Sequence, residues 1–176
     1  MPWRVSERMG HSRALIGRAR QSVEGPLFLL GGACLWGLVI VASYLAWEWR
    51  LTGFNRFHLP VTVAIHFGAG FLGFLGGVPV ARFLAMGRPP ETRLAGTFLC
   101  LSSGTLGFML VLLYLQYRRF YAQWHDPFLT KTWVIQQIET VLGAGYQYLV
   151  LGLPHLLPIA FPLLVLTSFA VAKRMR

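Results

Sequence analysis

The stretch PVTVAIHFGAGFLGFLGGVPVARFL, residues 60–84, decides the fold of this chain. It contains no Asp, Glu or Lys, and its one charge, Arg82, lies near its end, where a long side chain can reach the lipid headgroups. A hydrocarbon layer about 30 Å thick needs roughly 20 residues of helix. In lipid such a run must be helical, because every backbone N–H and C=O needs a partner within the segment. We therefore expect this stretch to span a membrane.

Three further stretches share this length and character, namely residues 26–47, 94–115 and 152–172, and none contains Asp, Glu, Lys or Arg. The composition agrees, with 55% apolar residues, 12% charged residues and a mean hydropathy of +0.55. A soluble domain carries about 25% charged residues. The sequence predicts an all-α, polytopic membrane protein: a four-transmembrane-helix bundle that forms a single domain over residues 26–176.

The distribution of Lys and Arg predicts the orientation. Eleven precede the first span, separate the second from the third or follow the fourth: Arg4, Arg8, Arg13, Arg18, Arg20, Arg82, Arg88, Arg93, Lys173, Arg174 and Arg176. The other two connections carry five: Arg50, Arg56, Arg118, Arg119 and Lys131. Since the richer side faces the cytoplasm, both termini should be cytoplasmic, and we expect a bacterial inner membrane protein. The net charge of +10 then indicates orientation and contact with anionic lipids, and not nucleic acid.

Residues 1–25 form a basic segment that we expect on the cytoplasmic side. The apolar run that follows is about twice as long as the 7–15-residue core of a secretion signal, and no A-x-A site comes after it. The run should therefore remain as a membrane anchor. Apolar residues among the five arginines suggest a surface helix that binds anionic headgroups, and a disordered basic tail is the alternative.

Residues 132–151 are ambiguous. As a fifth span they would place Gln136, Gln137 and Glu139 in the bilayer, where a central acid costs about 2.5–3.5 kcal/mol. One apolar helical stripe lies opposite the glutamines and Thr140, and it consists of Val134, Ile135, Ile138, Val141, Leu142, Gly145 and Leu149. We interpret the segment as an amphipathic interfacial helix before the last span, lying on the outer face or dipping into the membrane.

Small residues recur every four positions in three of the spans. They are Ala69, Gly73 and Gly77 in the second span, Ser103 and Gly107 in the third, and Ala33 and Gly37 in the first. Such stripes let two helix backbones approach closely. We expect helix-packing seams within the bundle, with contacts to other chains as the alternative.

Histidines supply the one constellation that can carry chemistry. His66 shares its helical face with the Ala69 stripe, and His155 begins the proline-rich fourth span at a comparable depth. Two inward imidazoles can bind haem or hydrogen-bond a quinone. Nearer the outer surface, a copper or zinc site could use His58, His125, Asp126 and Glu139. The alternative is that each histidine has a structural role and forms a hydrogen bond within the protein.

Aromatic residues gather near the predicted outer boundary: Tyr44, Trp47, Trp49, Tyr114, Tyr117, Phe120, Tyr121, Trp124 and Trp133. A belt at the headgroup level is the expected interpretation. An aromatic entrance for a quinone or another flat, lipid-soluble ligand is the alternative.

The layout of four spans with an amphipathic stretch before the last is similar to that of the DsbB family of quinone-linked thiol oxidases. That family works through two pairs of periplasmic cysteines. Here Cys34 and Cys100 are both expected inside spans, so the resemblance implies topology and not thiol–disulfide exchange.

No catalytic motif marks the chain as an enzyme. The sequence has no G-x-S-x-G, H-E-x-x-H or phosphate-loop pattern, and its six acidic residues are scattered. We therefore expect a non-catalytic accessory, scaffold or assembly subunit that packs against other integral membrane proteins in a larger complex. The alternatives are a redox-linked subunit that binds haem or quinone near the outer face, and a transporter component.

Overall fold

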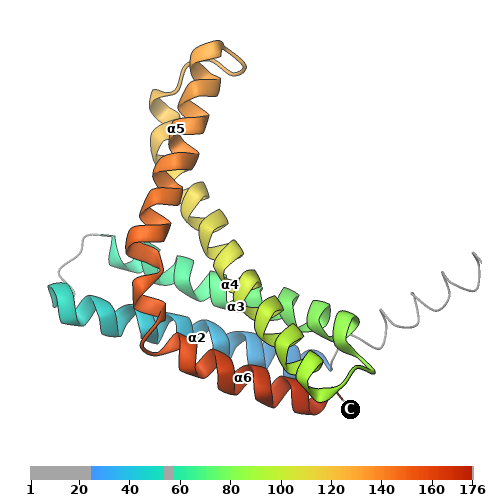
Figure 1. The fold of residues 1–176 in the computed structure, drawn as a ribbon. Helices are drawn as coiled ribbons and strands as arrows, with labels where there is room; N and C mark the ends of the chain where they lie inside the picture. The colour runs from blue at the N-terminus through green and yellow to red at the C-terminus, as the bar shows by residue number, and fades with distance from the viewer. Residues whose placement is uncertain (1–24, 54–57, 176) are drawn as a thin grey trace, which may run out of the picture.

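The computed structural model describes residues 25–53 and 58–175, and within them every regular element is helical (Figure 1). The predicted basic segment at the N-terminus falls almost wholly outside this part. The helices are α2 (Pro26–Thr52), α3 (Leu59–Ala85), α4 (Pro90–Tyr121), α5 (Lys131–Gln147) and α6 (Ala160–Arg174). Short turns extend them, a 3-10 turn at Ala122–Trp124, a π-helical turn at Tyr148–Gly152 and a 3-10 turn at Pro154–Leu156.

Three of these segments are long and apolar enough to cross a membrane: Pro26–Leu51, Leu59–Ala85 and Pro90–Trp124. A fourth crossing is possible only as a broken pair, Lys131–Leu156 followed by Ala160–Arg174, whose two parts are bent by 71°. The chain is thus an all-α protein whose apolar helices suit an integral membrane protein, with three candidate spans or up to four.

The predicted fourth span, residues 152–172, is not one continuous helix. The regular helix α6 covers only 15 residues of this region. Pro158 lies at the break, because it lacks an N–H group and its ring would clash with the carbonyl four residues earlier. Pro162 falls in the first turn of α6, where a proline costs no helical hydrogen bond.

The helices form a bundle from which one hairpin diverges. In Figure 1, α2, α3 and α6 run across the lower part of the view, whereas α4 rises obliquely and α5 returns from its far end. Arg93 Nη1 donates to the carbonyl of Met175 at 2.6 Å, and the guanidinium of Arg174 lies 4.4 Å from the centre of the Phe28 ring. The starts of α2 and α4 and the end of α6 therefore meet at one end of the bundle.

The closest packing in the molecule joins α3 to α4. Ala69, Gly73 and Gly77 are all buried on α3. A Cβ atom added at Gly73 would lie 2.6 Å from Cα of Thr105, and one added at Gly77 would lie 2.7 Å from the carbonyl oxygen of Cys100. Both distances are shorter than any real Cβ contact, so the two backbones touch only because these positions lack side chains.

The contact between α2 and α3 uses small residues in the same way. Ala33 is fully buried, and Gly37 is buried beside Phe67 of α3. A Cβ atom at Gly70 would lie 2.8 Å from Cα of Gly37. The central helix α3 is thus flanked by α2 on one side and α4 on another.

On α4 the packing face differs from the predicted one. Ser103 and Gly107 are exposed, and a Cβ atom at Gly107 would meet nothing within 4 Å. The buried face instead carries Thr97, Leu101, Thr105 and Met109. The seam predicted at Ser103 and Gly107 is therefore corrected to the neighbouring stripe.

Hydrogen bonds explain this rotation of α4. Trp36 Nε1 of α2 donates to Thr105 Oγ1 at 2.9 Å in the buried core, and the Thr105 hydroxyl donates to the carbonyl of Leu101 at 2.8 Å. Ser103 satisfies its own hydroxyl by donating to the carbonyl of Leu99 at 2.6 Å, so it can face outward without an unpaired polar group. The indole needs a partner inside the bundle, and the Thr105 face supplies one.

Helix α5 is amphipathic as predicted, but its polar face points inward. Thr140 is buried, and Gln137 contacts both Tyr114 of α4 and His125. The apolar stripe is exposed instead, at Val134, Ile135, Ile138, Val141, Leu142 and Leu149. A helix with its polar side chains satisfied inside and its apolar ones outside suits an apolar environment.

We expect Gly73→Leu to destabilise the protein, because the new side chain must displace the backbone of α4. Overpacking of this kind costs on the order of 1–3 kcal/mol, which should lower the midpoint of thermal unfolding in detergent. Gly107→Leu is the matched control, since it adds the same side chain to open space on α4. Equal stability of the two variants would contradict the close α3–α4 contact.

Candidate functional site

A cavity with several polar lining groups lies where the end of α2 and the start of α3 meet the second half of α4. Its volume is about 600 Å³, within the range of small-ligand sites. Its wall combines aromatic and aliphatic side chains with a few polar groups. The lining residues are Tyr44, Trp47, Glu48, Leu51, His58, Val61, Thr62, Ile65, His66, Leu113, Gln116, Tyr117, Phe120, Tyr121, Gln147, Gly152 and His155.

The structure brings the two predicted cofactor histidines together at this cavity. The ring centres of His66 and His155 lie 4.7 Å apart with a 58° angle between the ring planes. Tyr44 stacks on His66 at 4.2 Å and meets His155 edge-on at 5.6 Å. All three residues are at most 6% exposed. We call these rings the Tyr44–His66–His155 cluster.

The hydrogen bond of His66 shows that one ring nitrogen, Nδ1, carries a proton. Nδ1 of His66 lies 2.7 Å from the carbonyl oxygen of Thr62, one turn earlier on α3. A carbonyl oxygen only accepts hydrogen bonds, so Nδ1 carries the proton. In the neutral ring Nε2 then holds a lone pair. This atom is buried and has no hydrogen-bond partner among the described residues.

The break within the fourth predicted span positions His155. Because the helix stops at residues 157–159, the carbonyl of His155 does not serve a regular α-helical turn. Ser43 of α2 donates its hydroxyl to that carbonyl at 2.6 Å. This bond fixes the short 3-10 turn at Pro154–Leu156 against α2 and holds His155 beside Tyr44. The prolines thus create both the bend and the acceptor that anchors it.

Sequence reasoning missed two members of the site. It placed Tyr44 in a surface belt and left Glu48 among the scattered acidic residues. In the structure Tyr44 is buried, Glu48 is 1% exposed and Glu139 is exposed. The available signal was the buried stripe of α2, in which Trp36, Ile40, Tyr44 and Glu48 follow at every fourth residue.

The cluster does not have the geometry of an axial haem pair. Two imidazoles on one iron, each with a metal–nitrogen bond of about 2 Å, place their ring centres about 6 Å apart on opposite faces of the macrocycle. The rings of His66 and His155 are closer than this and are in contact. No macrocycle fits between them in this arrangement.

A quinone-type ligand requires fewer groups in a fixed geometry than haem does. It needs one hydrogen-bonding group beside an apolar slot wide enough for a flat ring. Nε2 of His66 provides the polar group. Aromatic and branched side chains such as Trp47, Ile65 and Leu113 provide the slot. The described residues therefore fit the predicted quinone better than the predicted haem.

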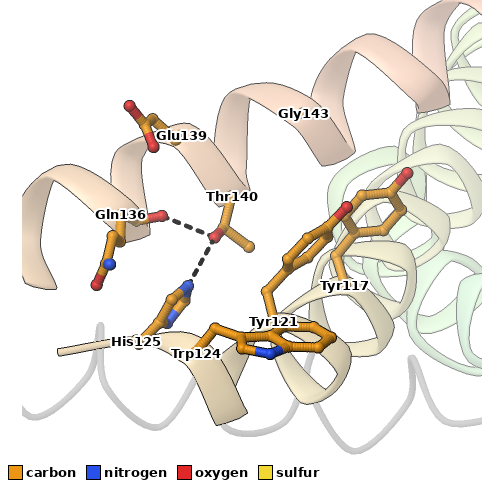
Figure 2. A pocket seen from close by; sticks show the side chains of 8 residues that line it. All are labelled: Tyr117, Tyr121, Trp124, His125, Gln136, Glu139, Thr140 and Gly143. Atoms are coloured by element: carbon orange, nitrogen blue, oxygen red, sulfur yellow. Dashed lines mark hydrogen bonds between the residues drawn. The ribbon is translucent and has the colours of Figure 1, made fainter.

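A smaller cavity of about 330 Å³ lies between the end of α4 and α5 (Figure 2). Its histidine is engaged at both nitrogens. Gln137 Nε2 donates to Nδ1 of His125 at 2.8 Å, and Nε2 of His125 lies 3.5 Å from Thr140 Oγ1, whose hydroxyl donates to the carbonyl of Gln136. Figure 2 shows the ring of His125 pointing toward the hydroxyl of Thr140. The network joins α5 to the preceding loop, which is a structural role.

The four predicted metal ligands are divided between places. His58 lines the larger cavity, whereas His125 and Glu139 line the smaller one, and Asp126 is exposed. Within residues 25–53 and 58–175, no group of three or more His, Cys, Asp or Glu side chains is placed to hold a metal ion. Metal binding at these four residues stays a prediction.

The site as a whole is an aromatic cavity whose lining includes His66, with its buried and unpaired Nε2. The Tyr44–His66–His155 cluster closes it toward the bundle core, and Glu48 adds a buried carboxyl group. Such an arrangement can hold and orient a small ligand through one strong directional contact. In comparisons with models of protein families, with curated proteins and with solved structures, the chain matches none.

Proposed function

We propose that this chain is a membrane subunit that binds a quinone-type, lipid-soluble ligand at the Tyr44–His66–His155 cluster. The observation that carries the proposal is the lone pair of His66 Nε2, which is buried at a cavity and has no partner among the described residues. A buried polar atom without a hydrogen bond costs about 1–3 kcal/mol. A ligand that bonds to this atom removes that cost.

We further propose that the subunit has four spans with both termini in the cytoplasm, so that the cavity lies in the outer half of the bundle. The fourth crossing is then the bent pair of α5 and α6, or α6 with the turns before it. The contacts of Arg93 and Arg174 support this topology, because they place the C-terminal end of α6 beside the starts of α2 and α4.

A second candidate role is that of an accessory subunit in a larger complex, in which the hairpin of α4 and α5 contacts a partner. In the most apolar 18-residue stretch of α4, only 17% is buried, whereas 39% is buried in the corresponding stretches of α2 and α3. The hairpin diverges from the other helices in Figure 1 and exposes the apolar stripe of α5. A second membrane protein would cover this surface with interhelical packing.

The ligand proposal predicts that the purified protein retains a quinone that organic extraction and mass spectrometry can identify. Leu113→Trp should abolish this, since an indole at Leu113 fills the cavity. Leu110→Trp is the control, because Leu110 is exposed on the same helix. If the wild-type protein carries no quinone and binds none when it is added, the proposal fails. A Soret absorption band would favour haem instead.

The topology proposal predicts the location of reporter fusions. Fusions at Arg88 and Arg176 should report the cytoplasm, and a fusion after Trp124 should report the opposite side. An external C-terminus would contradict the proposal, because α5 and α6 would then either not cross the membrane or cross it separately.

The accessory role predicts protein contacts at the hairpin. A photo-reactive residue at Ile138, which is 54% exposed on α5, should cross-link to another membrane protein in intact membranes. The same residue at Leu38, which is 57% exposed on α2, is the control and should label lipid. Lipid adducts alone at both positions would argue that lipid covers the hairpin.

A further inference from the structure

The hydrogen bonding of His66 indicates which chemical form of ligand the cavity takes. We propose that the ligand is held by an aromatic hydroxyl group that donates a hydrogen bond to Nε2 of His66. The cavity would therefore bind a hydroquinone more tightly than the corresponding quinone. This inference rests on the proposed function, since it names the chemical state of the ligand at the same site.

In the first step, the proton on Nδ1 of His66 determines which ring nitrogen is left to accept a hydrogen bond. Thr62 offers a carbonyl oxygen 2.7 Å from Nδ1 of His66, and this pairing requires Nδ1–H as the donor. A backbone carbonyl within a helix cannot turn away, so this tautomer is held in place. Nε2 of the neutral ring is then a buried acceptor on a side chain that lines the cavity.

The second step is the charge of the ring. An imidazolium would place a full charge among Tyr44, Ile65 and other largely apolar side chains, and removing a charge from water is costly. Glu48 is the acid close enough for its charge to act on His66. It can support the partial positive charge that the ring gains when Nε2 accepts a hydrogen bond. The surroundings thus suit a neutral imidazole whose Nε2 accepts a hydrogen bond without taking the proton.

The third step compares the two ligand forms. A quinone presents only carbonyl oxygens, so its lone pairs would face the lone pair of Nε2. A hydroquinone presents an O–H group that pairs with Nε2 directly. Trp47, Tyr117 and Phe120 line the same cavity and favour a flat aromatic ring beside them. A lipid headgroup hydroxyl has the donor but lacks the ring.

The test is a binding comparison with the full chain in phosphatidylcholine nanodiscs. Decylubiquinol, kept reduced under anaerobic conditions, and decylubiquinone are titrated separately by calorimetry. We expect the reduced form to bind about tenfold more tightly, which corresponds to one hydrogen bond gained in place of an unpaired group. His66→Asn should remove this preference, since its amide can still donate to the Thr62 carbonyl but presents nothing at the Nε2 position.

His66→Gln should retain part of the preference, because its longer side chain can place an amide oxygen near the position of Nε2. His125→Asn is the control histidine, which lies in the smaller cavity and should leave both affinities unchanged. Thermal unfolding confirms that each variant is folded. If His66→Asn does not fold, ¹⁵N NMR of the wild-type imidazole decides, because decylubiquinol should shift the Nε2 signal and decylubiquinone should not.

Three outcomes would overturn the inference. The first is that decylubiquinone binds as tightly as decylubiquinol, and the second is that the preference survives in His66→Asn. The third is that nanodiscs of phosphatidylglycerol weaken the binding of decylubiquinol, because the hydroxyl groups of this lipid then compete for His66. The first two leave the proposed function intact, because a ligand of the quinone class still binds. If neither compound binds, the proposed function fails together with the inference.

Discussion

The rest of the structure depends on the contact of two helix backbones at Gly73. With no side chain at this position, α3 and α4 approach until the Cβ position of Gly73 would overlap the backbone of Thr105. In lipid, helices gain little by burying apolar surface, so close packing and interhelical hydrogen bonds must hold them together. The same approach orients Thr105 toward Trp36 of α2. One glycine contact thus sets the mutual rotation of three helices.

That rotation also determines where the candidate site lies. His66 is seven residues before Gly73 on α3, so the face that packs on α4 near Gly73 continues toward the imidazole. Beyond this contact α4 diverges from α3 and α2, and its aromatic residues Tyr117 and Phe120 line the larger cavity. The cavity therefore exists because the helices are tightly joined at one level and separate at the next.

The sequence was sufficient to predict the helical, membrane-compatible class, the seams at Ala69, Gly73 and Gly77, and a shared location for His66 and His155. These follow from periodicity and length, which are local properties of the chain.

The packing face of α4 was predicted one stripe away from its true position, because Ser103 and Gly107 are small residues at the expected spacing. The true face carries Thr105, which accepts a hydrogen bond from Trp36. Trp36 lies 69 residues away in the sequence, so this pairing is not a local property of the chain. The breaking of the fourth span could be anticipated from the prolines, whereas the donor of Ser43 to His155 could not, since the two are distant in sequence. Tyr44 and Glu48 were missed because a polar residue near a span end is usually solvated, and only the packing of the other helices around it shows that it is buried.

The polar face of α5 and the end of α4 connect the two cavities. On α5 the polar face is satisfied by His125 and by the end of α4, so the apolar face is left outside. Tyr117 and Tyr121 line both the larger and the smaller cavity, so they form a wall that the two share. The His125 network contacts α5 and neither tyrosine, so the two cavities share a wall but not their hydrogen bonds.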